Sequence, residues 1–166
     1  MDNQIALVLL EMIRRNGGDQ KRIEHSLKVY GYAQLLGKLE GLSPEKQLIL
    51  ELTAILHDIG ICVSEAKYGY SDGEKQEIEG PPVARQILER LSVDAEVIDR
   101  VCFIISKHHT FSAIDGIDFQ LLVEADFLVN SVEEEVSPEG VKKFVAMNFI
   151  SDAGRKTIGY LFKALP

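Results

Sequence analysis

Apolar residues recur with the spacing of an α-helix along almost the whole chain, and no stretch alternates apolar and polar residues as a half-buried strand does. Leu48, Leu52 and Ile55, for example, stand at i, i+4 and i+7 after the dipeptide Ser43-Pro44. A serine followed by proline is typical of a helix start, because the hydroxyl caps the first turn and proline needs no amide partner there. The pattern predicts an all-α protein, a bundle of about seven or eight helices.

Breaks in the periodicity set the expected boundaries. Asn-Gly-Gly at residues 16–18 ends the first helix, since glycine adopts the left-handed conformation of a helix exit. Residues 61–79 combine glycines and charges with weak periodicity, so we expect a long loop there, and loops of this length are usually functional. Pro81 is expected to open the next helix. The expected helices comprise residues 3–15, 19–38, 43–60, 81–91, 92–107 and 118–131, followed by two that begin after Ser137-Pro138 and after Ser151.

Length and composition limit the class of protein. A chain of 166 residues fits a single domain that can bury its own core. Lys and Arg total 18 against 26 Asp and Glu, and the resulting net charge of −8 disfavours a partner that is a nucleic-acid polymer. The two cysteines, Cys62 and Cys102, show no pairing pattern, and no leader or membrane-spanning stretch is recognisable. We therefore expect a cytoplasmic protein that does not act at a membrane; its oligomeric state stays open.

One histidine occupies a helix face that is otherwise apolar. His25 shares its face of the second expected helix with Val29, Tyr32 and Leu36, at i+4, i+7 and i+11. Arg22 lies three residues earlier, on the same side. A cation so close disfavours the imidazolium form of His25. The position of Arg22 therefore suits a neutral, metal-binding imidazole or an anion bound nearby. The structural alternative is a core histidine whose hydrogen bonds are satisfied.

Carboxylates also lie among apolar residues. Asp126 stands within the apolar stretch of residues 121–129, where a buried carboxylate is unfavourable unless it is paired or bound to a metal. Glu124 is two residues away and cannot share its face, so at least one of the two points toward apolar neighbours. His57-Asp58 ends the third helix, where a looser turn lets both side chains lean into one site. Alternatively, Asp126 faces solvent and His57-Asp58 forms a surface ion pair.

Two imidazoles and two carboxylates from three helices constitute a mixed nitrogen–oxygen ligand set. Such a set suits Mn²⁺, Fe²⁺, Co²⁺, Ni²⁺ or Zn²⁺ rather than a thiolate-bound metal. The sequence therefore predicts a divalent metal ion as cofactor, with its identity open.

Three segments, taken in order, resemble the HD superfamily of metal-dependent phosphohydrolases, whose signature is a His, a His-Asp pair and a distal Asp on an all-α bundle. The first segment is Arg-Ile-Glu-His at 22–25, and the second is Ala-Ile-Leu-His-Asp-Ile-Gly at 54–60. The third is Glu-Ala-Asp-Phe-Leu at 124–128, where the family usually has Ala-Asp-x-Leu. The resemblance covers about residues 19–130 and is specific because all three motifs occur together.

This resemblance implies one HD-like domain over residues 1–166, with C-terminal helices at 137–165 packing on the motif-bearing core. It implies that His25, His57, Asp58 and Asp126 are the ligands of one metal. The implied activity is hydrolysis of a small phosphate ester, such as a nucleoside monophosphate, by a metal-activated water that Asp58 also orients.

The chain departs from the family pattern at one position and leaves a choice at another. Many two-metal members have a histidine where this chain has Glu79. Glu79 is then an oxygen ligand to a second metal, or a group that binds the metal's water and handles its proton. Alternatively the second metal site is absent, or Glu79 is only a charge at a helix N-terminus. The tandem pair His108-His109 follows two adjacent apolar stripes, so spacing does not choose between them; the resemblance favours His108 as a phosphate contact, proton carrier or outer ligand.

Further residues are candidates for binding the substrate. Lys67 and Tyr68 lie in the expected loop after the second motif, where a lysine can reach a phosphate and a tyrosine can stack on a base. Arg22 and Lys107 are further candidates for neutralising phosphate charge during catalysis. For each of these residues, the alternative is an ordinary solvated charge or ring.

Two other functions remain compatible with the same residues. One is a non-catalytic metal- or nucleotide-binding module, in which the ligands hold a structural or regulatory ion. The other is a non-hydrolytic metal enzyme, such as a lyase or an oxygenase, on the same scaffold.

Overall fold

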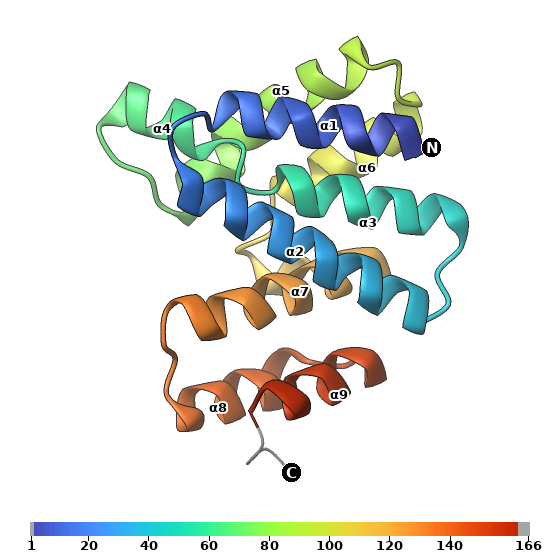
Figure 1. Ribbon diagram of the computed structural model, residues 1–166, viewed down its shortest axis with the longest axis vertical. Helices are drawn as coiled ribbons and strands as arrows, with labels where there is room; N and C mark the ends of the chain where they lie inside the picture. The colour runs from blue at the N-terminus through green and yellow to red at the C-terminus, as the bar shows by residue number, and fades with distance from the viewer. Residues whose placement is uncertain (1, 163–166) are drawn as a thin grey trace.

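The computed structural model describes residues 2–162; Met1 and residues 163–166, which include the predicted end of the C-terminal helices at 165, lie outside the described residues. The described residues form α-helices and one 3₁₀ turn and contain no β-strand, which confirms the all-α fold class (Figure 1). The elements are α1 (Asp2–Arg15), α2 (Gln20–Leu39), α3 (Pro44–Leu56), α4 (Ile61–Tyr68), α5 (Gly73–Arg90), α6 (Ala95–Ile105), η1 (Phe111–Ala113), α7 (Ile117–Glu133), α8 (Pro138–Asn148) and α9 (Asp152–Leu161).

Side-chain caps begin most of these helices. The Ser43 hydroxyl accepts a hydrogen bond from the Lys46 amide, and Ser137 caps α8 in the same way, so both serine–proline starts are confirmed. Asp19 caps α2 by accepting from the Arg22 amide. Each cap satisfies an amide that the first helical turn leaves without a backbone partner.

The predicted loop at residues 61–79 is wrong, because most of this segment is helical. Helix α4 occupies its first part and ends at Gly69, which has a left-handed φ of 81°. Helix α5 begins at Gly73, where the Asp72 carboxylate accepts from the Lys75 amide, and it continues through Pro81 and Pro82. Pro81 therefore does not open the helix. The cap at Asp72 sets the start of α5 earlier than the prolines would. The helix then continues although Pro81 and Pro82 have no amide N–H to donate to its backbone.

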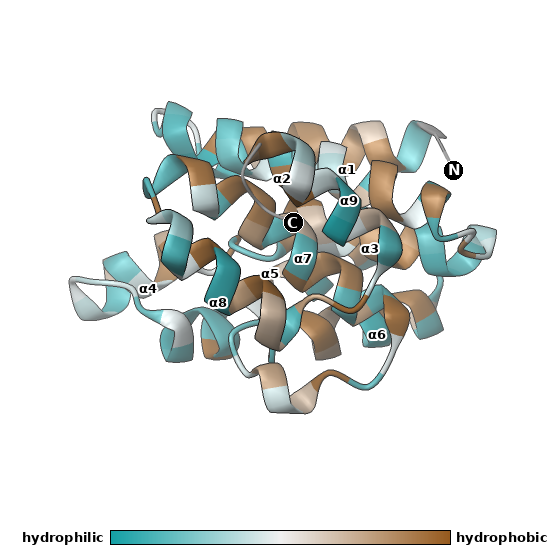
Figure 2. Cartoon of the chain, turned by 90° about the horizontal axis from the view of Figure 1, so that it is seen from below, coloured by the Kyte–Doolittle hydropathy of each residue, from teal (hydrophilic) through white to brown (hydrophobic). Residues whose placement is uncertain are grey.

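Helix α3 occupies the centre of the bundle. It packs against α1, α2, α6 and α7, and its residues from Ile49 to Leu56 are all buried. Helices α2 and α7 also pack against each other, so α2, α3 and α7 are mutual neighbours. Other helices are amphipathic: Figure 2 shows hydrophobic and hydrophilic positions side by side along their turns. The three sequence motifs lie on these three central helices and on the turn that directly follows α3.

A buried carboxylate joins the C-terminal helices to this centre. Glu124 of α7 is fully buried and accepts hydrogen bonds from Gln120 Nε2 at 2.8 Å, from the Ile150 amide at 2.9 Å and from the Ser151 amide at 3.1 Å. The Ser151 hydroxyl donates to the same carboxylate. In Figure 1, α8 and α9 lie at the end of the molecule opposite α1. Glu124 therefore anchors the connection between α8 and α9, and Asp126 remains for another role.

One segment, Pro44–Tyr68, is long and apolar enough to cross a membrane by length and composition alone, although we predicted no such span. Its most apolar 18-residue stretch has a mean hydropathy of 1.4, and 67 % of that stretch is buried inside the fold. It contains the central helix α3, and burial in a protein core accounts for its apolar character.

The turn after α3 depends on a glycine that lies against the backbone of α5. A Cβ atom on Gly60 would lie 2.6 Å from the Gly80 amide nitrogen and 2.9 Å from its Cα, so neither backbone has room for a side chain. We expect Gly60→Ala to destabilise the protein by about 1–3 kcal/mol in urea-induced unfolding, as overpacking does.

Gly31 is the matched control, because it lies exposed within α2 and a Cβ there meets nothing within 4 Å. Gly31→Ala should be neutral or stabilising by up to about 1 kcal/mol, through helix propensity alone. Wild-type stability in Gly60→Ala would contradict the close packing of the two backbones.

Candidate metal centre

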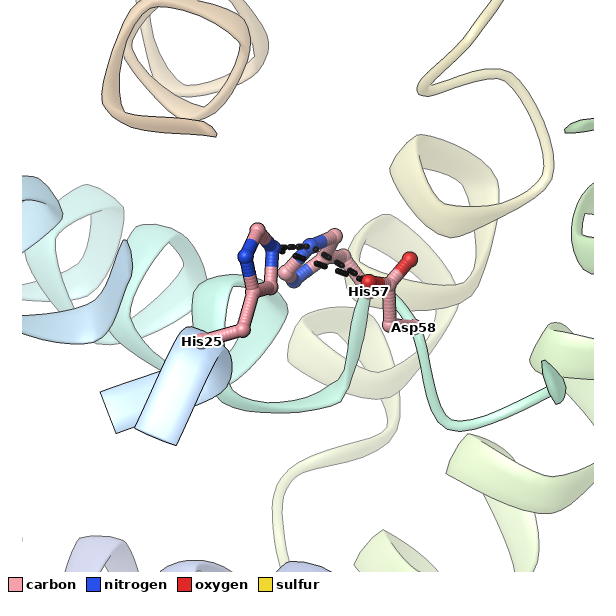
Figure 3. Close-up of side chains that lie close together, drawn as sticks. All are labelled: His25, His57 and Asp58. Carbon is pink, nitrogen blue, oxygen red and sulfur yellow. Dashed lines mark hydrogen bonds and ion pairs between the residues drawn. The ribbon is translucent and has the colours of Figure 1, made fainter. Parts of the chain in front are cut away.

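The His-Asp pair lies in the tight turn that joins α3 to α4. The Ile59 amide donates to the Leu56 carbonyl and the Ile61 amide to the Asp58 carbonyl, so the chain tightens here to i+3 bonding. This geometry turns the neighbouring side chains His57 and Asp58 toward the same space, as the sequence analysis expected. Figure 3 shows both of them facing His25, which comes from α2.

Four side chains from the three motifs meet at this place. His25 Nε2 lies 3.4 Å from His57 Nε2 and 3.6 Å from an Asp58 oxygen. Asp126 Oδ1, on α7, lies 3.2 Å from His25 Nε2 and 3.5 Å from His57 Nε2. His57 Nε2 is 3.4 Å from Asp58. The structure thus brings together all four residues that the sequence analysis selected as metal ligands.

The other ring nitrogen of each histidine is already committed. His57 Nδ1 lies 2.9 Å from the Ala54 carbonyl oxygen, which only accepts, so Nδ1 carries the proton. His25 Nδ1 lies 2.8 Å from a carboxylate oxygen of Glu133 and donates to it in the same way. In the neutral rings, both Nε2 atoms therefore present lone pairs to each other and to two carboxylates.

The local electrostatics favour a positive charge between these groups. Burial opposes protonation of His57, but the charge of Asp58 and the proximity of Asp126 outweigh it and raise the pKa of His57 well above its usual value. Burial likewise opposes ionisation of Asp126, but His25 and His57 outweigh it and hold the pKa of Asp126 below its usual value. The site is thus suited to charged carboxylates around a cation.

The donor set fits a divalent metal ion. Two ligands bonded to one ion at about 2.1 Å lie about 3.0–3.4 Å apart at octahedral or tetrahedral angles, close to the separations found here. Asp126 Oδ1 is buried and makes no hydrogen bond within residues 2–162, so it still needs a partner. His25, His57 and Asp58 form a group whose ligand atoms all lie close enough to hold one ion.

A second group shares Asp58 with the first. Ligand atoms of Asp58, His108 and His109 lie within 4.8 Å of one another. His108 is buried, its Nδ1 lies 2.7 Å from the Ile105 carbonyl, and its Nε2 lies 3.7 Å from Asp58 without a hydrogen bond among the described residues. His109 is exposed and pairs with Gln76 at 2.7 Å. Of the tandem pair, His108 therefore points its free nitrogen at the site.

Glu79 makes its contacts with the α4 residues rather than with the four metal-ligand candidates. The Lys67 ammonium and the Tyr68 hydroxyl each donate to the same Glu79 oxygen at 2.7 Å. These hydrogen bonds, that of Lys67 first, lower the pKa of Glu79. Three residues that the sequence analysis considered separately thus form one cluster, with Lys67 neutralised by Glu79.

The remaining two candidates lie apart from the cluster of ligand atoms. The Arg22 guanidinium pairs with Glu65 at 2.5 Å and with Asp19 at 3.2 Å. Lys107 is exposed, at the end of α6. Among the described contacts, neither side chain reaches the four metal-ligand candidates.

One residue of the site was missed by the sequence analysis. Glu133 accepts from His25 Nδ1, and its other oxygen accepts from Lys28 at 2.9 Å. It lies seven residues, or about two helical turns, after Asp126 on α7, so that helical spacing was the signal that could have identified it. A carboxylate behind a ligating histidine orients the ring and raises its basicity.

A cavity of about 300 Å³ adjoins the cluster, and His57, His108 and Asp126 form part of its lining. A larger hollow of about 420 Å³ between α1, α2 and α3 contains none of the metal-ligand candidates. Ligands bind in concave sites where polar groups converge, so the smaller cavity is the one that fits a substrate.

The fold and this cluster define a class: an all-α bundle with histidines and aspartates arranged to hold a divalent metal. A sequence profile of the HD domain family matches residues 22–146, more than half of the chain, and the chain belongs to this family. The match extends beyond the three motifs into α8. Searches among curated proteins and among solved structures found no significant match.

Asp126→Asn tests the distal carboxylate. The amide keeps the shape of the side chain but loses its charge, so we expect metal affinity to fall by more than the roughly 10- to 100-fold that loss of an outer partner causes. Affinity is measured by calorimetric titration of metal-free protein. Asp99 is an exposed carboxylate that pairs with Arg85. The variant Asp99→Asn is therefore the control, and it should bind metal as the wild type does. Equal affinity in both variants would exclude Asp126 as a ligand.

Glu133→Gln tests the carboxylate behind His25. The amide still faces Nδ1 but cannot accept as strongly, so we expect a loss of roughly 10- to 100-fold in metal affinity with the fold intact. Its neighbour Glu134 is the matched control, since Glu134→Gln removes the same charge one residue away. If both variants lose affinity equally, the effect of Glu133 is only that of its charge.

Proposed function

We propose that the protein is a metal-dependent hydrolase of a small phosphate monoester, such as a nucleoside monophosphate, with His25, His57, Asp58 and Asp126 as the metal ligands. One observation carries the proposal: the Nε2 atoms of two histidines, whose Nδ1 atoms face acceptors, converge with two carboxylates, in an HD domain chain, beside a cavity large enough for a small ligand. The metal belongs to the set Mn, Fe, Co, Ni and Zn, which suits these ligands. The proposed location is the cytoplasm.

A bound divalent ion would lower the pKa of a coordinated water and polarise a phosphoryl oxygen. In the overall reaction, the oxygen of water adds to phosphorus, the ester P–O bond breaks, and the alcohol leaves with a proton. The half-buried Asp58 carboxylate lies between His57 and His108, at 3.4 Å and 3.7 Å, and is proposed to orient the attacking water. His108 Nε2 is the nearest free nitrogen for moving a proton.

The other residues support this reaction from the periphery. Lys67 and Tyr68 lie on α4, which directly follows the His-Asp turn, and they bind Glu79 of α5; Glu79 is proposed to act on the water or on a weaker second ion at Asp58, His108 and His109. Lys67 and Tyr68 then influence the reaction through Glu79. Arg22 and Lys107 are proposed to contribute only long-range positive potential, because neither contacts the cluster among the described residues.

The test is turnover by metal-loaded protein on a panel of phosphate monoesters, followed as released phosphate. We expect activity that a chelator abolishes and that added metal restores. His108→Ala should lower kcat by roughly 10²-fold or more, the scale for loss of a positioned acid–base group, while the first metal is retained.

Two outcomes would contradict the proposal. Metal bound at full stoichiometry, with no turnover of any ester, would favour a non-catalytic metal-binding module or a non-hydrolytic metal enzyme. Full activity in His108→Ala would contradict the proposed role of His108 in proton transfer.

A further inference from the structure

The cavity beside the metal-ligand candidates has two unlike walls. One wall is polar and contains His57, His108 and Asp126. The apolar part of the lining includes three phenylalanines that contact one another, Phe111 of η1, Phe127 of α7 and Phe144 of α8. We call these three residues the aromatic wall. No motif of the sequence analysis includes Phe111 or Phe144, and the proposed chemistry uses none of the three.

The aromatic wall is well ordered by its own packing. Phe127 and Phe144 stack with ring centroids 3.7 Å apart and planes 5° apart. Phe111 meets Phe144 edge-on, at 5.6 Å and 89°. Behind them, Phe149 is 1 % exposed and packs against both Phe127 and Phe144. Because Phe111 remains 40 % exposed, the aromatic wall still presents ring surface to a ligand.

The charged residues in the lining of the cavity also limit what it can bind. Its lining within the described part of the chain contains no lysine or arginine. Its charged or titratable members are Asp126, Glu134 and the three histidines 57, 108 and 109. Glu134 is an acid in the lining that is not a metal-ligand candidate, so a negative group that extends away from the metal ligands meets repulsion and no cation among the described lining residues.

From these two observations we infer that the aromatic wall binds the leaving alcohol of the substrate and selects phosphate monoesters whose alcohol is uncharged and carries a planar aromatic ring. This inference rests on the proposed function, because it places the phosphate at the metal-ligand wall. An aromatic ring gains edge-to-face or offset-stacked contacts with phenylalanine beyond simple apolar burial. A pyrophosphate bridge in the same place would bring a second negative charge into a cavity without a lysine or arginine, so nucleoside diphosphates are disfavoured.

Two esters of similar leaving ability separate aromatic recognition from size. Benzyl phosphate and cyclohexylmethyl phosphate are both esters of primary alcohols with six-membered rings. We expect the kcat/KM of benzyl phosphate to exceed that of cyclohexylmethyl phosphate by about 2- to 10-fold, the scale of aromatic pair preferences. Phe111→Leu keeps an apolar side chain and should reduce this ratio toward one.

Phe103→Leu is the matched control. Phe103 is also 40 % exposed and also packs edge-on against another phenylalanine, Phe119, but it does not line the cavity. Its substitution should leave the ratio unchanged. An aromatic preference that is absent from the wild type, or that Phe103→Leu and Phe111→Leu reduce equally, would overturn the inference.

A binding measurement separates this inference from the proposed function. Calorimetry of metal-loaded protein should give tighter binding of benzylphosphonate than of methylphosphonate, and Phe111→Leu should remove the difference. If no ester is hydrolysed but this difference is present, the hydrolase proposal fails while the aromatic subsite stands. If esters are hydrolysed without any aromatic preference in turnover or binding, the subsite fails and the hydrolase proposal stands.

The charge argument has its own test in Glu134→Lys. The wild type should prefer a nucleoside 5′-monophosphate over the corresponding diphosphate by roughly tenfold or more in kcat/KM, because the cavity offers the second phosphate no cation. In Glu134→Lys, the introduced cation should reduce the ratio of kcat/KM between the monophosphate and the diphosphate. Equal use of the two nucleotides by the wild type would contradict the proposed selection by charge.

Discussion

The Nε2 lone pairs of two histidines and the oxygens of two carboxylates lie close together between α2, α3 and α7. These groups repel one another, and a positive charge between them is needed to stabilise the arrangement. His25 and His57 use their Nδ1 protons on acceptors behind them, so their Nε2 atoms face each other at 3.4 Å with no proton to share in the neutral state. The Oδ1 atom of Asp126 is buried beside both rings without a hydrogen bond among the described residues. A proton on one ring relieves part of this repulsion, and a divalent ion relieves all of it.

The helices that create this crowding are also those that bury the core. Because α2, α3 and α7 pack on one another, every ligand candidate stands on one of these packed helices or, for His57 and Asp58, in the turn that directly follows α3. Glu124 shows how closely a buried carboxylate must be matched. It is two residues from Asp126, yet its partners are two amides, a side-chain amide and a hydroxyl, which satisfy it completely within the protein. The Asp126 Oδ1 atom accepts no hydrogen bond among the described residues, and that contrast distinguishes the structural carboxylate from the metal-ligand candidate.

The sequence predicted the fold class and the four converging residues because both depend on local patterns. Helical periodicity is strong in the buried helices, and a polar residue within an apolar face, such as Asp126, stands out against it. The short helix α4 was missed because only Ser64 of its eight residues is buried, so it shows no apolar face. The choice between His108 and His109 depended on which of two adjacent stripes faces the site, which only the packing of α6 decides. The contacts of Glu79 could not be predicted, because its partners, Lys67 and Tyr68, belong to that same unrecognised helix.

The charged side chains near the site determine how this acidic protein can bind a phosphate ester. The nearby cations are already paired: Arg22 with Glu65 and Asp19, Lys67 with Glu79, and Lys75 with Asp72. Asp58, Asp126 and Glu133 add negative charge around the two histidines. In the metal-free state, the field at the ligand cluster therefore repels a phosphate, and the divalent ion supplies the missing attraction. Binding of the metal and binding of the phosphate are then coupled: each raises the affinity for the other by the same factor, since linkage is reciprocal. The scarcity of free basic residues is thus consistent with phosphate chemistry, because it makes substrate binding conditional on the metal.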